Sequence, residues 1–199
     1  MHPIEKQLHK DHYHFSRLLR CLQRQVESLE SDSRVENPLS LILDALDYIK
    51  VYPERWHHPV EDVIFAHIAR SHPQHAKKIA AIHAEHQDLE QSTRDLDALF
   101  TAIANDTVVP MDRLMRDSRE FLMRQLSHID RENELTYPLM AECLSDGDWQ
   151  ELEAQIEAAD DPLFGDNLRQ EYMELLDYVL ESEAHQQIQA AISQPARRI

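Results

Sequence analysis

The chain has 199 residues, a length that suits one domain with a buried core and a further segment. Its formal net charge of −17 argues against nucleic acid and anionic membrane surfaces as partners, because like charges repel. Two glycines in the whole chain leave little material for hairpin turns, and the abundance of Ala, Leu, Glu, Gln and Arg predicts an all-α fold.

The N-terminus and the cysteines bear on where the protein works. The first twelve residues, MHPIEKQLHKDH, lack the features of a signal peptide, and no apolar run approaches the length of a membrane span. Cys21 and Cys143 show no motif spacing and are interpreted as reduced thiols. We therefore expect a cytoplasmic protein without a membrane partner.

Four long helices are predicted in residues 1–145. Apolar residues recur with helical spacing from Leu8 to Val26, and prolines or short polar stretches separate the later segments. The predicted helices span residues 4–29, 38–70, 74–105 and 111–144. Pro53 and Pro59 are expected to bend the second helix, and Pro138 to kink the fourth. Long helices with short connections are typical of an up-down-up-down four-helix bundle.

Residues 146–199 are predicted to form a C-terminal helical extension of this bundle. Helices are expected over residues 149–159 and 168–192. The second of them carries an apolar stripe made of Tyr172, Leu175, Leu176, Val179 and Leu180. Such a stripe packs either on its own bundle or on a second copy of the chain, so a homodimer is one expected assembly.

Two His-x-x-x-Glu pairs and two single histidines stand out among the thirteen histidines. These residues are His12, His57, Glu61, His86, His128 and Glu132. A spacing of four places an imidazole and a carboxylate on one helical face, with their Cβ atoms about 5–6 Å apart. Counting from each helix connection at about 1.5 Å per residue places all six at the same depth in the bundle.

This convergence favours a metal site. A lone buried histidine is usually a core residue with a satisfied hydrogen bond, but four histidines and two carboxylates in one buried slice require a shared partner. Six ligands are too many for one structural zinc. If each glutamate bridges two ions, each ion receives two histidines and two carboxylate oxygens. An oxo or hydroxo bridge then leaves one position open, which suits iron and a ligand such as O₂, NO or peroxide.

The stretch HHPVED raises the question of which adjacent histidine faces the centre. Neighbouring residues lie about 100° apart on a helix, so only one His-x-x-x-acid pair can point to the bundle axis. The apolar stripe that follows continues the face of Glu61. We therefore predict His57 and Glu61 as ligands, with His58 at the periphery or behind the ligands, unless a distortion at Pro59 changes the facing. Glu90 is interpreted as a supporting or salt-bridging carboxylate rather than a ligand.

With these motifs in this order, the sequence resembles the hemerythrin-like family of HHE cation-binding domains. The resemblance covers about residues 4–144 and rests on His12, HHPVED, His86 and HIDRENELTYP. It implies a non-haem di-iron centre inside a four-helix bundle, with ligand roles for the six residues named above. Two features depart from the family's oxygen carriers. They have two histidines four residues apart on the third helix, whereas His86 here has Ile82 four residues before it and Glu90 four residues after it; and they have an aspartate where this chain has Glu132.

The predicted ligand set is more similar to that of the bacterial iron–sulfur repair proteins and of the iron-sensing domain of an F-box protein. This favours reaction or sensing at an open site over oxygen carriage. The main interpretation is a protein that binds or senses O₂, NO or peroxide, or handles iron. The alternatives are a di-iron enzyme, such as a peroxidase, an NO or O₂ reductase or an iron–sulfur repair protein, and a metal-poor helical scaffold.

Overall fold

The structure, a computed structural model, describes residues 1–30 and 38–193, with side chains through Ala184. Residues 31–37, in the predicted connection between the first two helices, lie outside this part. The described residues are mainly helical and contain no strand, which confirms the all-α prediction. A search of the same residues finds no helix that is both long and apolar enough to cross a bilayer.

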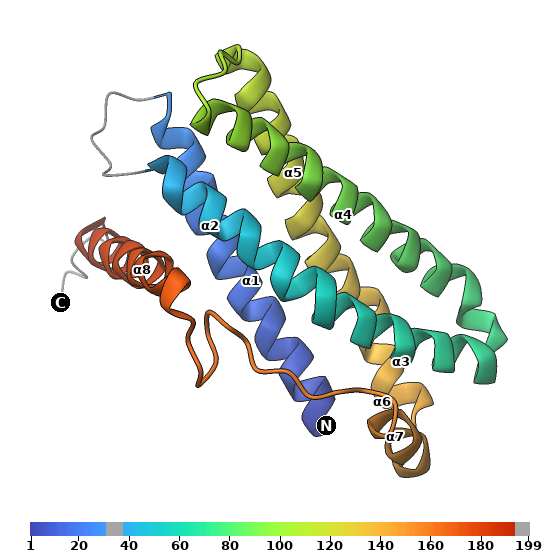
Figure 1. Ribbon diagram of the computed structural model, residues 1–199. Helices are drawn as coiled ribbons and strands as arrows, with labels where there is room; N and C mark the ends of the chain where they lie inside the picture. Colours follow the sequence, from blue (N-terminus) through green and yellow to red (C-terminus); the bar gives the residue numbers. More distant parts are fainter. Residues whose placement is uncertain (31–37, 194–199) are drawn as a thin grey trace.

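Four helical rods, numbered 1 to 4 along the chain, form the body of the molecule (Figure 1). Rod 1 is α1, Pro3–Ser28. Rod 2 consists of α2 (Pro38–Val51), η1 (Pro53–His57) and α3 (His58–Ser71). Rod 3 is α4 (Ala76–Ala104), preceded by the short η2 (Pro73–His75). Rod 4 consists of α5 (Met111–Arg131), η3 (Glu132–Thr136) and α6 (Tyr137–Cys143). Each rod contacts the next in a ring: α1 with α2, α2 and α3 with α4, α4 with α5, and α5 with α1.

Two π-helical segments interrupt the regular helices. At the end of η1, the N–H of His58 bonds to the carbonyl of Pro53, five residues back. At the end of η3, the N–H of Tyr137 bonds to the carbonyl of Glu132 in the same way. In both cases a proline follows at once, and its ring would clash with the carbonyl four residues back in a regular helix. The predicted distortions at these prolines therefore take the form of widened turns, which are common at functional sites.

The buried apolar residues form two clusters, and the predicted ligands lie between them. One cluster holds the later half of α1, α2, the later half of α4 and most of α5, with Phe15, Tyr48 and Phe100 among its members. The other surrounds Leu8 and Ile64 at the opposite end of the bundle. His12, His57, His86 and Glu132 fall between the two clusters along their rods, and Glu61 and His128 lie beside the cluster members Val60 and Ile129, so the centre has packed hydrocarbon on both sides. This placement shields it from bulk water.

The C-terminal extension contains α7 (Asp146–Glu153), η4 (Gln170–Tyr172) and α8 (Met173–Ser193). The first of these begins earlier than predicted because Ser145 caps it, with Asp148 returning a hydrogen bond to the cap. Helix α8 lies against α1 and α2 (Figure 1). Tyr172, Leu175 and Val179 of the predicted stripe are buried there and Leu176 is partly buried, whereas Leu180 is exposed, so most of the stripe packs on its own bundle.

Candidate metal centre

The six predicted ligands meet in one buried site. His12 comes from α1, His86 from α4 and His128 from α5, whereas Glu61 lies in the first turn of α3. The two π-helical segments contribute their end residues, His57 closing η1 and Glu132 opening η3. None of the six is more than 3 % exposed. Counting residues along the rods therefore located them correctly in depth.

The Glu61 carboxylate lies between histidines of different rods. Its Oε1 is 3.3 Å from Nε2 of His57 and 3.6 Å from Nε2 of His12. Its Oε2 is 3.5 Å from Nε2 of His86, on the other side. One carboxylate thus presents one oxygen to each half of the site, as a bridging ligand does.

The Glu132 carboxylate takes a matching position. Its Oε2 is 3.2 Å from Nε2 of both His12 and His128. Its Oε1 is 3.2 Å from Nε2 of His86. Two ligand atoms that are each about 2.1 Å from one ion and at right angles to each other lie about 3 Å apart. The separations around both glutamates are close to this value, so the donor atoms are already gathered at coordination spacing.

Several buried donor atoms in the site have no hydrogen-bond partner among the described residues. They are Nε2 of His57 and His128, Nδ1 of His58, and Oε2 of Glu61 and Glu132. A buried polar group without a partner is destabilising, and a buried charge more so. Nitrogen and oxygen atoms that point inward in this way fit metal ions as their common partner.

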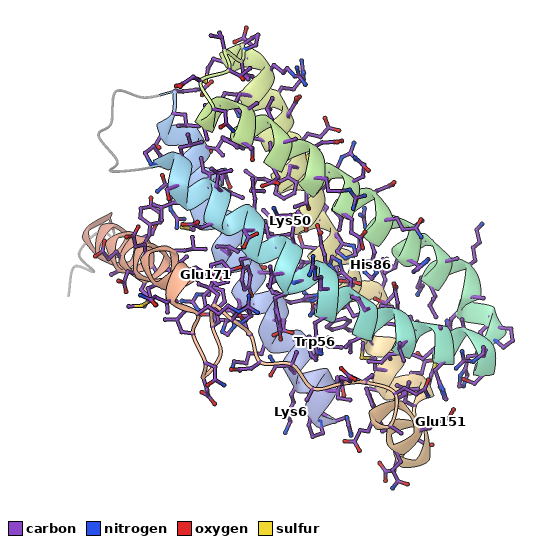
Figure 2. All side chains as sticks on the ribbon, viewed as in Figure 1. Lys6, Lys50, Trp56, His86, Glu151 and Glu171 are labelled. Atoms are coloured by element: carbon purple, nitrogen blue, oxygen red, sulfur yellow. The ribbon has the colours of Figure 1, made fainter. Side chains whose placement is uncertain are left out.

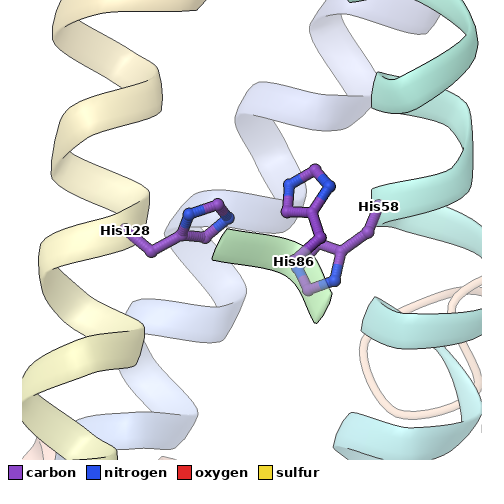
Figure 3. Close-up of side chains that lie close together, drawn as sticks. All are labelled: His58, His86 and His128. Atoms are coloured by element: carbon purple, nitrogen blue, oxygen red, sulfur yellow. The ribbon is translucent and has the colours of Figure 1, made fainter. Parts of the chain in front are cut away.

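His58 lies inside the cluster, and its expected peripheral position was wrong. Its ring stacks on that of His86, with centroids 4.4 Å apart, and meets the ring of His128 edge-on at 5.6 Å. Figure 3 shows the three rings side by side, each from a different rod. One nitrogen from each lies within 4.8 Å of the others. The expectation assumed a regular helix, but the widened turn before His58 lets His57 and His58 both reach the centre.

The donors divide unevenly into two groups. His58, His86 and His128 form one, and His12 and His57 form the other together with the two glutamates. Through their second oxygens the glutamates also reach the three-histidine side. The site therefore offers two groups of metal-donor residues, one with three histidines and the other with two.

Each of the four predicted histidine ligands is held from behind through its Nδ1 atom. The pairs are His57 with Asp11 (3.0 Å), His86 with Asp62 (2.9 Å), His128 with Glu85 (3.1 Å) and His12 with Asn133 (3.0 Å). An Nδ1–H that donates to an oxygen leaves the Nε2 lone pair free to bind a metal in the centre. Sequence reasoning missed these four partners, although each stands next to a predicted ligand.

Tyr137 is also part of the site. Its hydroxyl donates a hydrogen bond of 2.5 Å to Oε1 of Glu61 and lies 3.0 Å from Nε2 of His12. Burial, followed by the negative charges of the two glutamates, raises the pKa of this phenol well above its ordinary value. The hydroxyl therefore keeps its proton and orients Glu61 in the metal-free protein. Glu90, by contrast, pairs with Arg94 at 3.5 Å, as a salt-bridging carboxylate does.

The electrostatics of the metal-free site show how strongly it attracts cations. Burial opposes the charged form of His12, but hydrogen bonds to Glu132 and Glu61 outweigh it and raise the pKa to about 10. For His86, bonds to Asp62 and Glu132 likewise outweigh burial and raise the pKa to about 10. His58 behaves in the opposite way, because burial and then the neighbouring His86 lower its pKa well below the ordinary value. In the metal-free protein, protons on His12 and His86 thus neutralise the negative charge of the glutamates, a role that metal ions would take over on binding.

A small cavity of about 20 Å³ lies against the histidines on the side of the larger apolar cluster. Its polar lining includes His12, His57, His58 and His128, and most of the rest is hydrocarbon: Phe15, Leu18, Leu19, Ile49, Pro53 and Ile129. A cavity of this size admits about one water-sized molecule. It offers a small, mostly apolar chamber next to the donor atoms.

Comparison with known proteins agrees with this site. A search of curated proteins found no match. The family model of the hemerythrin HHE cation-binding domain matches residues 4–140, which is more than half of the chain and includes every donor described above. The chain therefore belongs to the hemerythrin HHE cation-binding family.

Proposed function

We propose that the chain holds two non-haem iron ions and binds a small ligand, O₂, NO or peroxide, at the ion carried by His12 and His57. The observation that supports this most directly is the uneven division of the histidines between the two halves of the site. Histidine and carboxylate donors with an open position suit iron. The iron, when bound, would supply the redox chemistry and the affinity for the ligand.

The number of donors predicts where the ligand binds. Three histidines, two carboxylate oxygens and one shared bridging oxygen make six donors for one ion. Two histidines with the same carboxylates and bridge make five for the other, so one position stays open there. This assignment revises the even distribution expected from the sequence, because His58 adds a fifth histidine on one side only.

The surroundings favour a small, uncharged ligand. The cavity touches His12 and His57 as well as His58 and His128, has room for about one water-sized molecule and is otherwise lined largely by hydrocarbon. The apolar clusters on both sides of the ligand slice limit the entry of water and ions. The buried Tyr137 hydroxyl keeps its proton near the two-histidine half, where it orients Glu61. These features support ligand binding for sensing or detoxification.

The test is metal analysis combined with optical spectroscopy of the purified chain. We expect about two iron atoms per chain, as two groups of donors require. The spectrum of the reduced protein should change on addition of O₂ or NO. A chain that takes up no iron after anaerobic reconstitution would support the helical scaffold instead. Continuous turnover of peroxide, NO or O₂ with an electron donor would identify an enzyme.

A cavity variant tests where the ligand binds. Ile129 lines the cavity but is not one of the metal-donor residues. Ile129→Phe should therefore keep the iron content and lower the affinity for NO, because the larger ring fills the chamber. An unchanged affinity in a variant with full iron content would show that the ligand binds elsewhere.

A further inference from the structure

A line of contacting side chains runs from His57 towards the surface. Nδ1 of His57 lies 3.0 Å from Oδ2 of Asp11, and the hydroxyl of Tyr52 donates to the two oxygens of the same carboxylate at 3.3 and 3.4 Å. Asp11 is fully buried and also accepts a 2.7 Å hydrogen bond from Gln7. By contrast, the side chains of Asp62 and Glu85, which hold other histidines, are 29 and 27 % exposed.

The line continues from Tyr52 to an indole at the surface. The rings of Tyr52 and Trp56 are stacked, with centroids 5.4 Å apart and planes inclined by 14°. Trp56, which is labelled in Figure 2, is partly exposed. Its Nε1 donates a hydrogen bond of 2.7 Å to the carbonyl of Glu157. A surface pocket of about 410 Å³ opens beside the indole, between Ile4 and Ile156. The contacts therefore connect a predicted iron ligand with a side chain that an external molecule can approach.

We propose that Trp56 and Tyr52 form the route by which electrons enter the centre. This inference rests on the proposed function, since it requires iron beside His57. Indole and phenol rings are the side chains that lose and regain single electrons most readily, and stacking brings their π systems into contact. The hydrogen bonds through Asp11 complete the connection to the imidazole. The donor is a small one-electron reductant that reaches the indole from solvent.

The electron balance is simple with a reduced viologen as the donor. The viologen radical cation gives up one electron and becomes the dication, while one ferric ion becomes ferrous, and no atom is transferred. The net charge of −17 attracts a cationic donor to the protein. Reduced methyl viologen is therefore the probe for the experiment.

The chain provides matched controls for both aromatic residues. Trp149, the second of the two tryptophans, stacks on His2 with centroids 4.3 Å apart, and Tyr48 donates its hydroxyl to Asp161 rather than to Asp11. Trp56→Phe keeps a ring in the stack but removes the oxidisable indole, and Trp149→Phe makes the same change elsewhere. Tyr52→Phe and Tyr48→Phe form the second pair.

The first measurement is the rate at which reduced methyl viologen reduces the ferric protein. Trp56→Phe and Tyr52→Phe should slow this step by about tenfold, whereas Trp149→Phe and Tyr48→Phe should leave it close to the wild-type rate. Equal iron content in all four variants excludes an indirect effect through metal loss. Reduction of Trp56→Phe at the wild-type rate, with iron fully bound, would overturn the proposed route.

The second measurement uses the metal-free protein and does not depend on iron. Pulse radiolysis with azide radicals removes one electron from an indole and yields azide. In the wild type, the Trp56 radical should then take an electron from Tyr52, whose hydroxyl proton passes to Asp11. The indole radical absorption should decay as phenoxyl absorption appears, and this transfer should be lost in Tyr52→Phe. Identical decay in Tyr52→Phe and the wild type refutes the aromatic step, even if the iron site itself is confirmed.

Discussion

Replacing His58 by leucine should stabilise the metal-free protein. The imidazole is 5 % exposed, its Nδ1 has no hydrogen-bond partner among the described residues, and its pKa is lowered well below the ordinary value by burial and His86. It is therefore a neutral, incompletely paired polar group in the core. Replacing such a group with an apolar side chain of similar size should raise the free energy of unfolding by about 1–3 kcal/mol. For a chain of this size, that raises the Tm of the metal-free protein by roughly 2–12 °C.

The same variant should weaken the iron-loaded protein. His58→Leu removes one of the three histidine donors from its half of the site, so the iron content should fall from about two towards one per chain. Bound metal stabilises the native state by an amount that increases with the affinity for the ion, so the loss of one ion should lower the Tm of the iron-loaded variant. One substitution should thus have opposite effects on stability in the two forms.

The assay compares the melting of wild type and variant after treatment with a chelator and after reconstitution with iron, together with metal analysis. His75→Leu is the control, because His75 lies near the turn between rods 2 and 3 and belongs to none of the groups of metal-donor residues. A lower Tm of metal-free His58→Leu, together with an iron content of two, would refute the reasoning. His58 would then be a packing residue and not a ligand.

Further predictions concern the phenol, pH and assembly. Tyr137→Phe removes the hydrogen bond that orients Glu61, so chelator competition should show iron affinity about 10–100-fold lower in a chain that still folds. In the metal-free protein, the raised pKa values of His12 and His86 give stability that is present below pH 6.5 and lost as the pH rises towards 10, so the Tm should fall across this window. Iron uptake should strengthen with pH over the same range, since the ions displace those protons; an affinity independent of pH would contradict this. Because most of the stripe of α8 packs on its own bundle, sedimentation at micromolar concentration should give the mass of one chain, and a dimer mass would show that an exposed surface associates.

Much of the bundle could be read from the sequence because a regular helix has a fixed rise. Equal numbers of residues on either side of a short connection must lie at equal depth in antiparallel helices. From the sequence alone this rule predicts that His12, His57, His86 and His128 lie at one depth, and in the structure all four lie in one buried site. Depth is insensitive to a local distortion, since one extra residue in a turn shifts it by only about 1.5 Å.

The direction in which a side chain points is far more sensitive. An extra residue in a turn rotates everything after it by about 100° relative to a regular helix. The prediction for His58 failed for this reason, because it carried a regular helix through the π-helical segment that ends at His57. The sequence does contain a signal for the widened turns. Both segments end two residues before a proline, Pro59 in one rod and Pro138 in the other.

The residues that hold Nδ1 of each ligand histidine follow a rule that combines depth in the bundle with side-chain direction. In rods 1 and 3, the residue before the ligand reaches the next rod: Asp11 before His12, and Glu85 before His86. In rods 2 and 4 it is the residue after the ligand glutamate, Asp62 or Asn133. The alternation has a geometric cause. Seen from one end of the bundle, reversing the chain direction reverses the sense in which successive residues rotate.

A step backwards in an ascending helix and a step forwards in a descending one therefore turn the same way around the bundle. Each rod aims its ligand at the axis and the adjacent acceptor at the following rod, until rod 4 returns to rod 1 through Asn133 and His12. The sequence contains the pairs DH, ED, EH and EN, but their meaning depends on the direction of each helix and on the order of neighbours. Once both are known, every acceptor can be assigned to its histidine, and the ring couples the orientation of each ligand to the packing of the rod before it.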